Sequence, residues 1–148
     1  MDLGEVLSLT VAIQRMELQR LDAISRLDWK GTGYPHLWQV LRDALHVDPH
    51  RAKQLVEQVE LVCPKTGITG QPIEPQLPAT RAAMAEGAIS AEHVSKIGAV
   101  IDKTPIEYRE QIDTDLAGRA REFTPRQVGL LGQRIVAALD PDGDGSGR

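Results

Sequence analysis

The chain has 148 residues, a formal net charge of −4 and only 3% aromatic residues. Because strands favour aromatic and β-branched side chains, this composition argues against a β-sandwich or a β-barrel. The acidic balance excludes a protein that coats nucleic acid through bulk positive charge. Cys63 is the only cysteine, which excludes an intrachain disulfide and a multi-cysteine metal site. No basic leader opens the chain and no apolar run approaches the roughly 18 residues of a membrane span, so a cytoplasmic protein without membrane contact is predicted.

Residues 2–28 predict one long helix. Its apolar residues recur at alternating spacings of three and four, with one interruption at Arg20: Val6, Leu9, Ile13, Met16, Ala23 and Leu27. Such a helix would be about 40 Å long, which exceeds the diameter of so small a domain. It must bury its apolar surface against the rest of the chain or against a second copy, and we expect a homodimer through residues 2–28. Arg20 weakens a simple coiled coil, yet a polar residue in such a row can set its register.

Residues 36–62 predict a helical hairpin. Two short helices, 36–45 and 49–62, are joined by Asp48-Pro49, an N-cap followed by proline at the first helical position. The apolar faces expected to meet are Leu37, Val40, Leu41 and Ala44 on one helix and Ala52, Leu55, Val56 and Val59 on the other. Such a pair can be a DNA-binding helix-turn-helix, but packing alone also produces it.

A loop rich in proline and glycine, residues 64–76, separates two halves, 1–63 and 77–139. Helices are predicted in the second half at 78–86, 90–103, 105–122 and 125–139. Their start signals are Ser90 and the two capping boxes that begin at Thr104 and Thr124. Residues 140–148 predict a flexible tail. The expected fold is therefore all-α: a single helical domain, residues 1–139, of six or seven helices with a long N-terminal helix and a helical hairpin.

The segments "TGQPIEPQLPATRAAMAEGAISAEHVSKI" and "LAGRAREFTPRQVGLLGQRIVAALDPDG" carry a family pattern. Its elements are the Leu77-Pro78-Ala79-Thr80 helix start, Gly87 with Ile89-Ser90, His93, and the closing Asp140-Pro141-Asp142-Gly143. Over roughly residues 34–143 the chain resembles the actinobacterial 13E12 repeat family, and more narrowly its N-terminal domain of unknown function 222. The first 30 residues match it only as a generic helix.

That resemblance implies a C-terminal HNH endonuclease domain, which this sequence does not supply. Such a domain uses His and acidic metal ligands and a positioning Asn, whereas this chain has no asparagine and no histidine after His93. The chain is therefore expected to be the accessory half of such a protein, a truncated relative or a fragment, and not itself an enzyme.

The remaining motifs favour structural roles, so no metal, cofactor or small-molecule substrate is expected. Asp140-x-Asp142-x-Asp144-Gly145 matches the start of an EF-hand loop, but the bidentate Glu at loop position 12 is missing. His46 and His50 have ligand spacing on a helix, yet Asp48-Pro49 breaks that helix. His93 is expected to cap or pack a helix, and Cys63 to be a structural thiol.

Nucleic-acid contacts, if made, are predicted at the start of the helix at 49–62. The exposed face at its N-terminus carries polar and basic residues beside the positive end of the helix dipole. The preceding helix adds one more basic residue. The candidate residues are Arg42, His50, Arg51, Lys53 and Gln54. Residues 31–63 hold three basic and four acidic side chains, so only weak binding to duplex DNA is expected.

Two functions remain open at this point. The first is a non-catalytic N-terminal domain of an HNH endonuclease-like protein that positions or regulates DNA engagement. The alternative is a self-association or protein-interaction module that does not bind nucleic acid.

Overall fold

Seven α-helices account for most of residues 2–139, the part of the chain that the computed structural model describes. They are α1 (Leu3–Ser25), α2 (Leu37–Leu45), α3 (Pro49–Val62), α4 (Pro78–Ala85), α5 (Ala91–Ile101), α6 (Arg109–Arg119) and α7 (Pro125–Leu139). Two short 3₁₀ turns, Lys30–Thr32 and Ile106–Tyr108, precede α2 and α6. The prediction of an all-α fold is confirmed.

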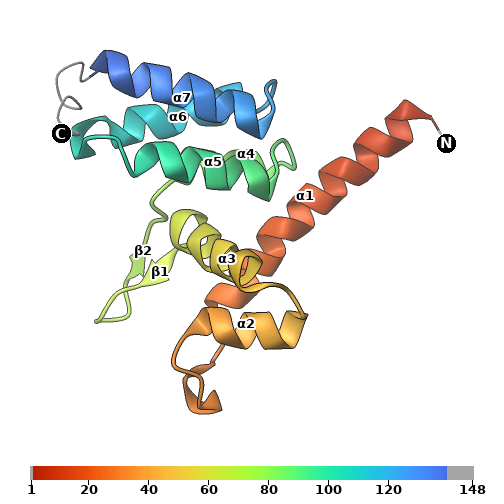
Figure 1. Cartoon of the computed structure of the whole chain (residues 1–148), viewed down its shortest axis with the longest axis vertical. Helices are drawn as coiled ribbons and strands as arrows, with labels where there is room; N and C mark the ends of the chain where they lie inside the picture. Colours follow the sequence, from red (N-terminus) through yellow and green to blue (C-terminus); the bar gives the residue numbers. More distant parts are fainter. Residues whose placement is uncertain (1, 140–148) are drawn as a thin grey trace.

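The helices form two groups that α1 connects (Figure 1). Helices α4–α7 stack together, α2 and α3 pair beside them, and α1 contacts α3, α4 and α5. The core is continuous across both groups, since Leu21 and Leu55 belong to the same buried cluster as Met84, Ile97 and Leu116. The N-terminal half of α1 projects away from this core (Figure 1).

Three predicted element boundaries are wrong. The first helix ends at Ser25 rather than near residue 28, because the N–H of Arg26 already turns back to the carbonyls of Ala23 and Ile24. The proline- and glycine-rich loop contains a small antiparallel hairpin, β1 (Lys65–Thr66) and β2 (Pro72–Ile73). The Thr104 hydroxyl donates to the carbonyl of Val100, so it closes α5 instead of capping the next helix. A 3₁₀ turn therefore stands where the start of a helix at 105 is expected.

The two other start signals in the second half are confirmed. Ser90 Oγ accepts the backbone N–H of His93, and the ring of His93 accepts the backbone N–H of Ser90 at 3.1 Å. This capping role of His93 matches the expectation for that residue. Thr124 and Gln127 form the reciprocal pair at the start of α7, with distances of 2.9 and 3.2 Å. The EF-hand-like motif at 140–145 and the predicted tail at 140–148 lie outside the described residues.

Two helices receive a carboxylate cap from a distant part of the chain. Asp113, in α6, is buried and accepts the backbone N–H groups of Ala79 and Thr80 at 2.8 and 3.0 Å. Glu17, in α1, accepts the backbone N–H of Ala91 at 3.0 Å. Both carboxylates satisfy N–H groups that a helix start leaves without a partner, and both complement the helix dipole. The second of these caps ties α1 to the start of α5.

Helix α1 passes close to the turn between α4 and α5 because Gly87 has no side chain. Gly87 has a φ of +75°, and a Cβ built there would lie 2.6 Å from the backbone oxygen of Val11. The side-chain amide of Gln14 donates to the Gly87 carbonyl at this crossing. Any side chain at position 87 would both strain the backbone and push α1 away.

We therefore expect Gly87→Ala to lower the free energy of unfolding by about 2 kcal/mol or more, since left-handed strain and overpacking add. The matched control is Gly118→Ala in α6, where an added Cβ meets nothing within 4 Å. There the gain in helix propensity should stabilise the protein by about 0.4–1 kcal/mol. Urea denaturation of the two variants measures both effects, and an equally stable Gly87→Ala protein would contradict this account of the crossing.

Candidate functional site

The five residues predicted to contact nucleic acid lie on α2 and the first turns of α3, and two of them lie over the half-buried ring of Trp38. The Arg42 guanidinium is 5.3 Å from the centre of the Trp38 ring, and the Lys53 ammonium is 4.6 Å from it. The hairpin thus brings together two of the predicted cations, one from each helix, over one aromatic ring. Cation–π contacts at exposed sites are worth about 0.5–1 kcal/mol each, which is enough to orient these side chains.

The predicted cations differ in how far their charge is already neutralised. Arg42 Nε lies 2.7 Å from Asp43 Oδ1, and the Arg42 hydrogen bond lowers the pKa of that carboxyl. Arg51 donates only a long hydrogen bond, 3.4 Å, to Gln54, and neither Arg51 nor Lys53 forms an ion pair with a carboxylate of residues 2–139. His50 is exposed in the first turn of α3. Arg51 and Lys53 are therefore the cations of this face that are most available to a phosphate.

The predicted pairing face of the hairpin is correct except at one end. Leu41, Ala52 and Leu55 are buried, whereas Ala44 is exposed near the end of α2. Asp48 occupies the predicted N-cap position of α3, although its side chain forms no capping hydrogen bond.

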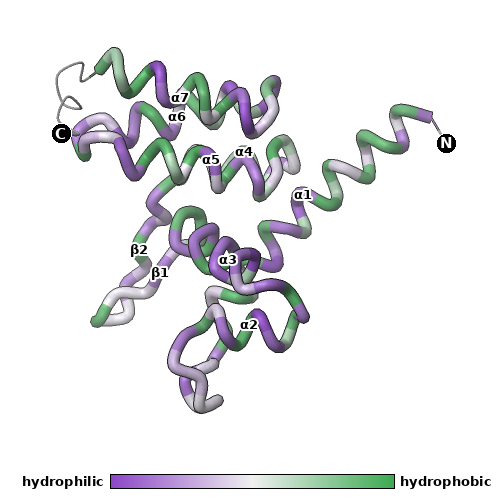
Figure 2. The backbone as a smooth tube through the Cα atoms, in the orientation of Figure 1, coloured by the Kyte–Doolittle hydropathy of each residue, from purple (hydrophilic) through white to green (hydrophobic). Residues whose placement is uncertain are grey.

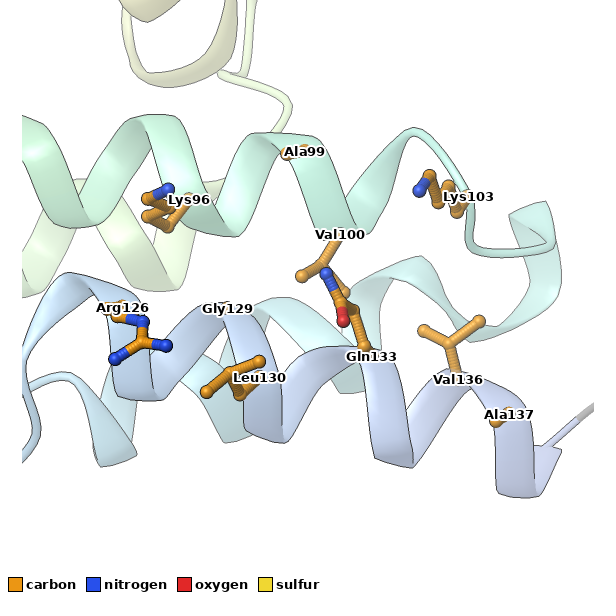
Figure 3. Close-up of a pocket in the computed structure, with 10 residues that line it drawn as sticks. All are labelled: Lys96, Ala99, Val100, Lys103, Arg126, Gly129, Leu130, Gln133, Val136 and Ala137. Carbon is orange, nitrogen blue, oxygen red and sulfur yellow. The ribbon is translucent and has the colours of Figure 1, made fainter.

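A groove between α5 and α7, with an apolar floor and basic side chains, is a second surface with clustered cations that the sequence did not predict (Figure 3). The two helices run in the same direction and approach closely, since a Cβ on Gly132 would lie 2.6 Å from Val100 Cγ2. The groove has a volume of about 810 Å³ and carries three cations and no acidic residue. Its lining is Lys96, Ala99, Val100, Lys103, Arg126, Gly129, Leu130, Gln133, Val136 and Ala137.

The spacing of the groove residues was visible in the sequence, but their proximity was not. Lys96 lies in α5 and Lys103 follows seven residues later, in the turn just past the end of that helix, while Leu130, Gln133 and Ala137 share a face of α7. Only the packing of α5 on α7 places these two faces beside each other. Two cations elsewhere are neutralised by carboxylates: Arg119 by Asp115 at 3.0 Å, and Arg121 by Glu86 at 2.9 Å.

Helix α1 carries a row of exposed apolar side chains that residues 2–139 leave uncovered. Val6, Leu9, Ile13 and Met16 recur at the predicted three- and four-residue spacing and are 46%, 53%, 59% and 62% exposed, respectively. We call these four residues the α1 stripe. Figure 2 shows hydrophobic segments along α1 where it projects from the remaining helices. The sequence leaves two possibilities open for this surface, burial against the rest of the chain or against a second copy. Residues 2–139 do not bury it in this half of α1.

The C-terminal half of α1 is held by a buried apolar patch and one ion pair. Leu18, Leu21 and Ile24 are buried, and Asp22 on the same half contacts Arg81 of α4. The two Arg81 nitrogens Nη1 and Nη2 donate to Asp22 Oδ1 and Oδ2 at 2.8 and 2.9 Å, and Nη1 also donates to the carbonyl at Val62. A single guanidinium thus joins α1, the end of α3 and α4.

Cys63 adjoins this junction and is inert as a thiol. It is buried and unpaired, and burial together with a hydrogen bond to Asp22 raises its pKa to about 12. Almost no thiolate forms at neutral pH, which matches the expected structural role. Among residues 2–139, no three His, Cys, Asp or Glu side chains gather into a group that could hold a metal ion.

An all-α domain is thus the class of protein that this fold defines. A family model for "Domain of unknown function (DUF222)" matches residues 8–148, and the chain belongs to that family. No solved structure matches the chain. No helix within residues 2–139 combines the length and apolar character needed to cross a membrane.

The chain is similar to several uncharacterized mycobacterial proteins. Rv1128c of Mycobacterium tuberculosis is 33% identical over 108 residues, which are 70% of this chain and 24% of the relative. Rv1945 of M. tuberculosis and Mb1179c of Mycobacterium bovis are each 31% identical over the same shares. The chain therefore spans about a quarter of the length of the curated relatives it matches.

The Asp22–Arg81 pair should make the stability of the domain depend on pH. Arg81 lowers the pKa of Asp22 below its ordinary 3.8, so the pair stabilises the fold above that pH and loses its effect as the pH falls through the lowered value. We expect Asp22→Asn to lower the free energy of unfolding at pH 7 by about 1–3 kcal/mol. The difference from the wild type should shrink below about pH 4.

Glu86→Gln is the matched control, because the Glu86–Arg121 pair is exposed and such pairs contribute little. Denaturant titrations of both variants from pH 7 to about pH 3 test the prediction. A difference between Asp22→Asn and the wild type that stays constant with pH would contradict it.

Proposed function

We propose that this domain is a non-catalytic assembly module of a longer cytoplasmic protein, and that α1 joins it to a second copy of the chain. The observation that carries the proposal is the α1 stripe, a regular apolar row on a helix half that the described residues leave uncovered. A contiguous apolar surface of this kind marks an interaction site more often than an accident of packing. A buried, unpaired Cys63 suits a reducing compartment.

The size of the stripe favours a weak, reversible dimer. Complete burial of one such side chain is worth about 1.5–3 kcal/mol, and these side chains are already about half buried. Two copies of the stripe would therefore contribute roughly 6–12 kcal/mol, while association costs about 4–15 kcal/mol. The two ranges nearly cancel, so the dimer should be weak: even the largest gain set against the smallest cost leaves about 8 kcal/mol, which corresponds to a micromolar Kd.

Ile13→Glu should abolish this association, because it places a charge in the middle of the stripe without touching the core. The matched control is Ile106→Glu, since Ile106 is 80% exposed and lies in the turn before α6. Light scattering across micromolar concentrations should show a dimer for the wild type and for Ile106→Glu, but a monomer for Ile13→Glu. A wild-type monomer at every concentration would refute the assembly proposal.

A second proposal is that the domain positions or regulates DNA engagement in a 13E12-type, HNH endonuclease-like protein. Two observations support it: Arg51 and Lys53 lack carboxylate partners within residues 2–139, and the relatives extend well beyond the matched region. The N-terminus of α3 lies next to both cations and favours phosphate. With so few cations, binding should be weak, with a Kd on the order of 10⁻⁴ to 10⁻⁶ M at physiological salt.

Reversing both charges, Arg51→Glu with Lys53→Glu, should abolish DNA binding without unfolding the domain, since neither side chain belongs to the core. The matched control is Arg119→Glu with Arg121→Glu, which removes cations that carboxylates already neutralise. Fluorescence anisotropy with a duplex at low and moderate salt measures the effect. No binding by the wild type near 50 mM salt would remove this second proposal.

A third variant tests the other basic surface. If the Arg51/Lys53 variant binds as well as the wild type, Lys96→Glu with Arg126→Glu in the groove between α5 and α7 should be the change that weakens binding. That result would move the nucleic-acid contact from the hairpin to the groove.

A further inference from the structure

The α1 stripe is complementary to itself when two copies of the helix run in opposite directions. Residues whose numbers sum to 22 then face each other: Leu9 meets Ile13, Val6 meets Met16, and Asp2 meets Arg20. Each contact occurs twice about a central two-fold axis, as an isologous interface requires. If Val6 is assigned heptad position a, then Leu9 is d, Ile13 is a and Met16 is d. Each facing pair joins an a position of one helix to a d position of the other, which is the pairing that antiparallel helices make.

We propose that two chains associate through an antiparallel α1–α1 pair in this register, fixed by ion pairs between Asp2 of one copy and Arg20 of the other. The inference rests on the proposed assembly function and specifies its partner and geometry. The partner is a second copy of this chain, because both charge and apolar spacing match under the two-fold operation.

The structure leaves the required side chains free for this contact. Asp2 and Arg20 are exposed, and neither forms an ion pair with any of residues 2–139. Asp2 uses Oδ1 to cap the N–H of Glu5, at 2.9 Å, and Oδ2 makes no hydrogen bond to the described residues. Helix α1 contacts its own domain through other residues, among them Val11, Gln14, Glu17 and Leu18.

A parallel pair would not satisfy the same charges. In a parallel, in-register arrangement Arg20 would meet Arg20 and Asp2 would meet Asp2, and like charges in such positions repel. The antiparallel register thus accounts for the interruption of the apolar row at Arg20, whereas the parallel register does not. There the guanidinium lies at the end of the stripe, opposite the first turn of the partner helix.

Disulfide trapping distinguishes the two directions. Val6→Cys and Met16→Cys are prepared as separate proteins, and both positions are exposed, so each variant should fold. A disulfide needs Cα atoms about 4.4–6.8 Å apart, whereas two copies of position 6 in the antiparallel pair are offset by about 15 Å along the axis. The native Cys63 does not interfere, because it is buried and its pKa is about 12.

Under mild oxidation we expect a covalent heterodimer when the two variants are mixed and no covalent dimer from either variant alone. Disulfide-linked homodimers of each variant alone would instead show a parallel pair and overturn the inference, while the assembly proposal would stand. Dimers by light scattering without any covalent product would likewise overturn the register but not the assembly. A monomer by light scattering would remove both.

Charge reversal gives an independent second measurement. Arg20→Glu should raise the dimer Kd about tenfold, since two exposed ion pairs become two repulsive contacts. The matched control is Arg26→Glu, which changes an exposed arginine just beyond the end of α1 and should leave the Kd unchanged. An unchanged Kd for Arg20→Glu would contradict the antiparallel register, because in a parallel pair one like-charge contact merely replaces another.

Discussion

The hydrogen bonds of the Arg81 guanidinium hold α1, α3 and α4 together, and the positions of these helices depend on them. The guanidinium binds both carboxylate oxygens of Asp22 in α1 and the carbonyl of Val62 at the end of α3, from a position in α4. Three helices from both halves of the chain therefore meet at one planar cation, whose fork-shaped donors fix direction as well as distance. The C-terminal half of α1 is anchored at this cation, and this fixes the direction in which the N-terminal half projects from the other helices (Figure 1).

Long-range capping stabilises the starts of two short helices, α4 and α5. Asp113 caps the start of α4 across 34 residues, and Glu17 caps the start of α5 across 74. Each carboxylate satisfies backbone N–H groups that water would otherwise have to solvate, and each does so only when the helices are packed. The formation of these helices is thus coupled to tertiary packing. Helix α1 takes part through the face that carries Glu17, while the face that carries the α1 stripe is exposed.

The two proposed functions, assembly and DNA contact, use different exposed surfaces on different helices. The α1 stripe offers apolar area and self-complementary charge, whereas the hairpin of α2 and α3 offers cations stacked on Trp38. Neither surface uses the residues of the other, so a variant that removes assembly need not change DNA contact. The groove between α5 and α7 adds a third, basic surface built from two helices that are adjacent only in the folded chain.

The sequence by itself determined the helical class, the apolar spacing of α1 and the helix starts at Ser90 and Thr124. These features follow from local periodicity and from side chains that reach only three or four residues along the chain. Tertiary structure alone decided that Thr104 ends α5, that α1 passes close to Gly87, and that Lys96, Lys103 and Arg126 line one groove. It also decided that the α1 stripe stays uncovered, because exposure depends on where distant helices pack, which no local pattern encodes.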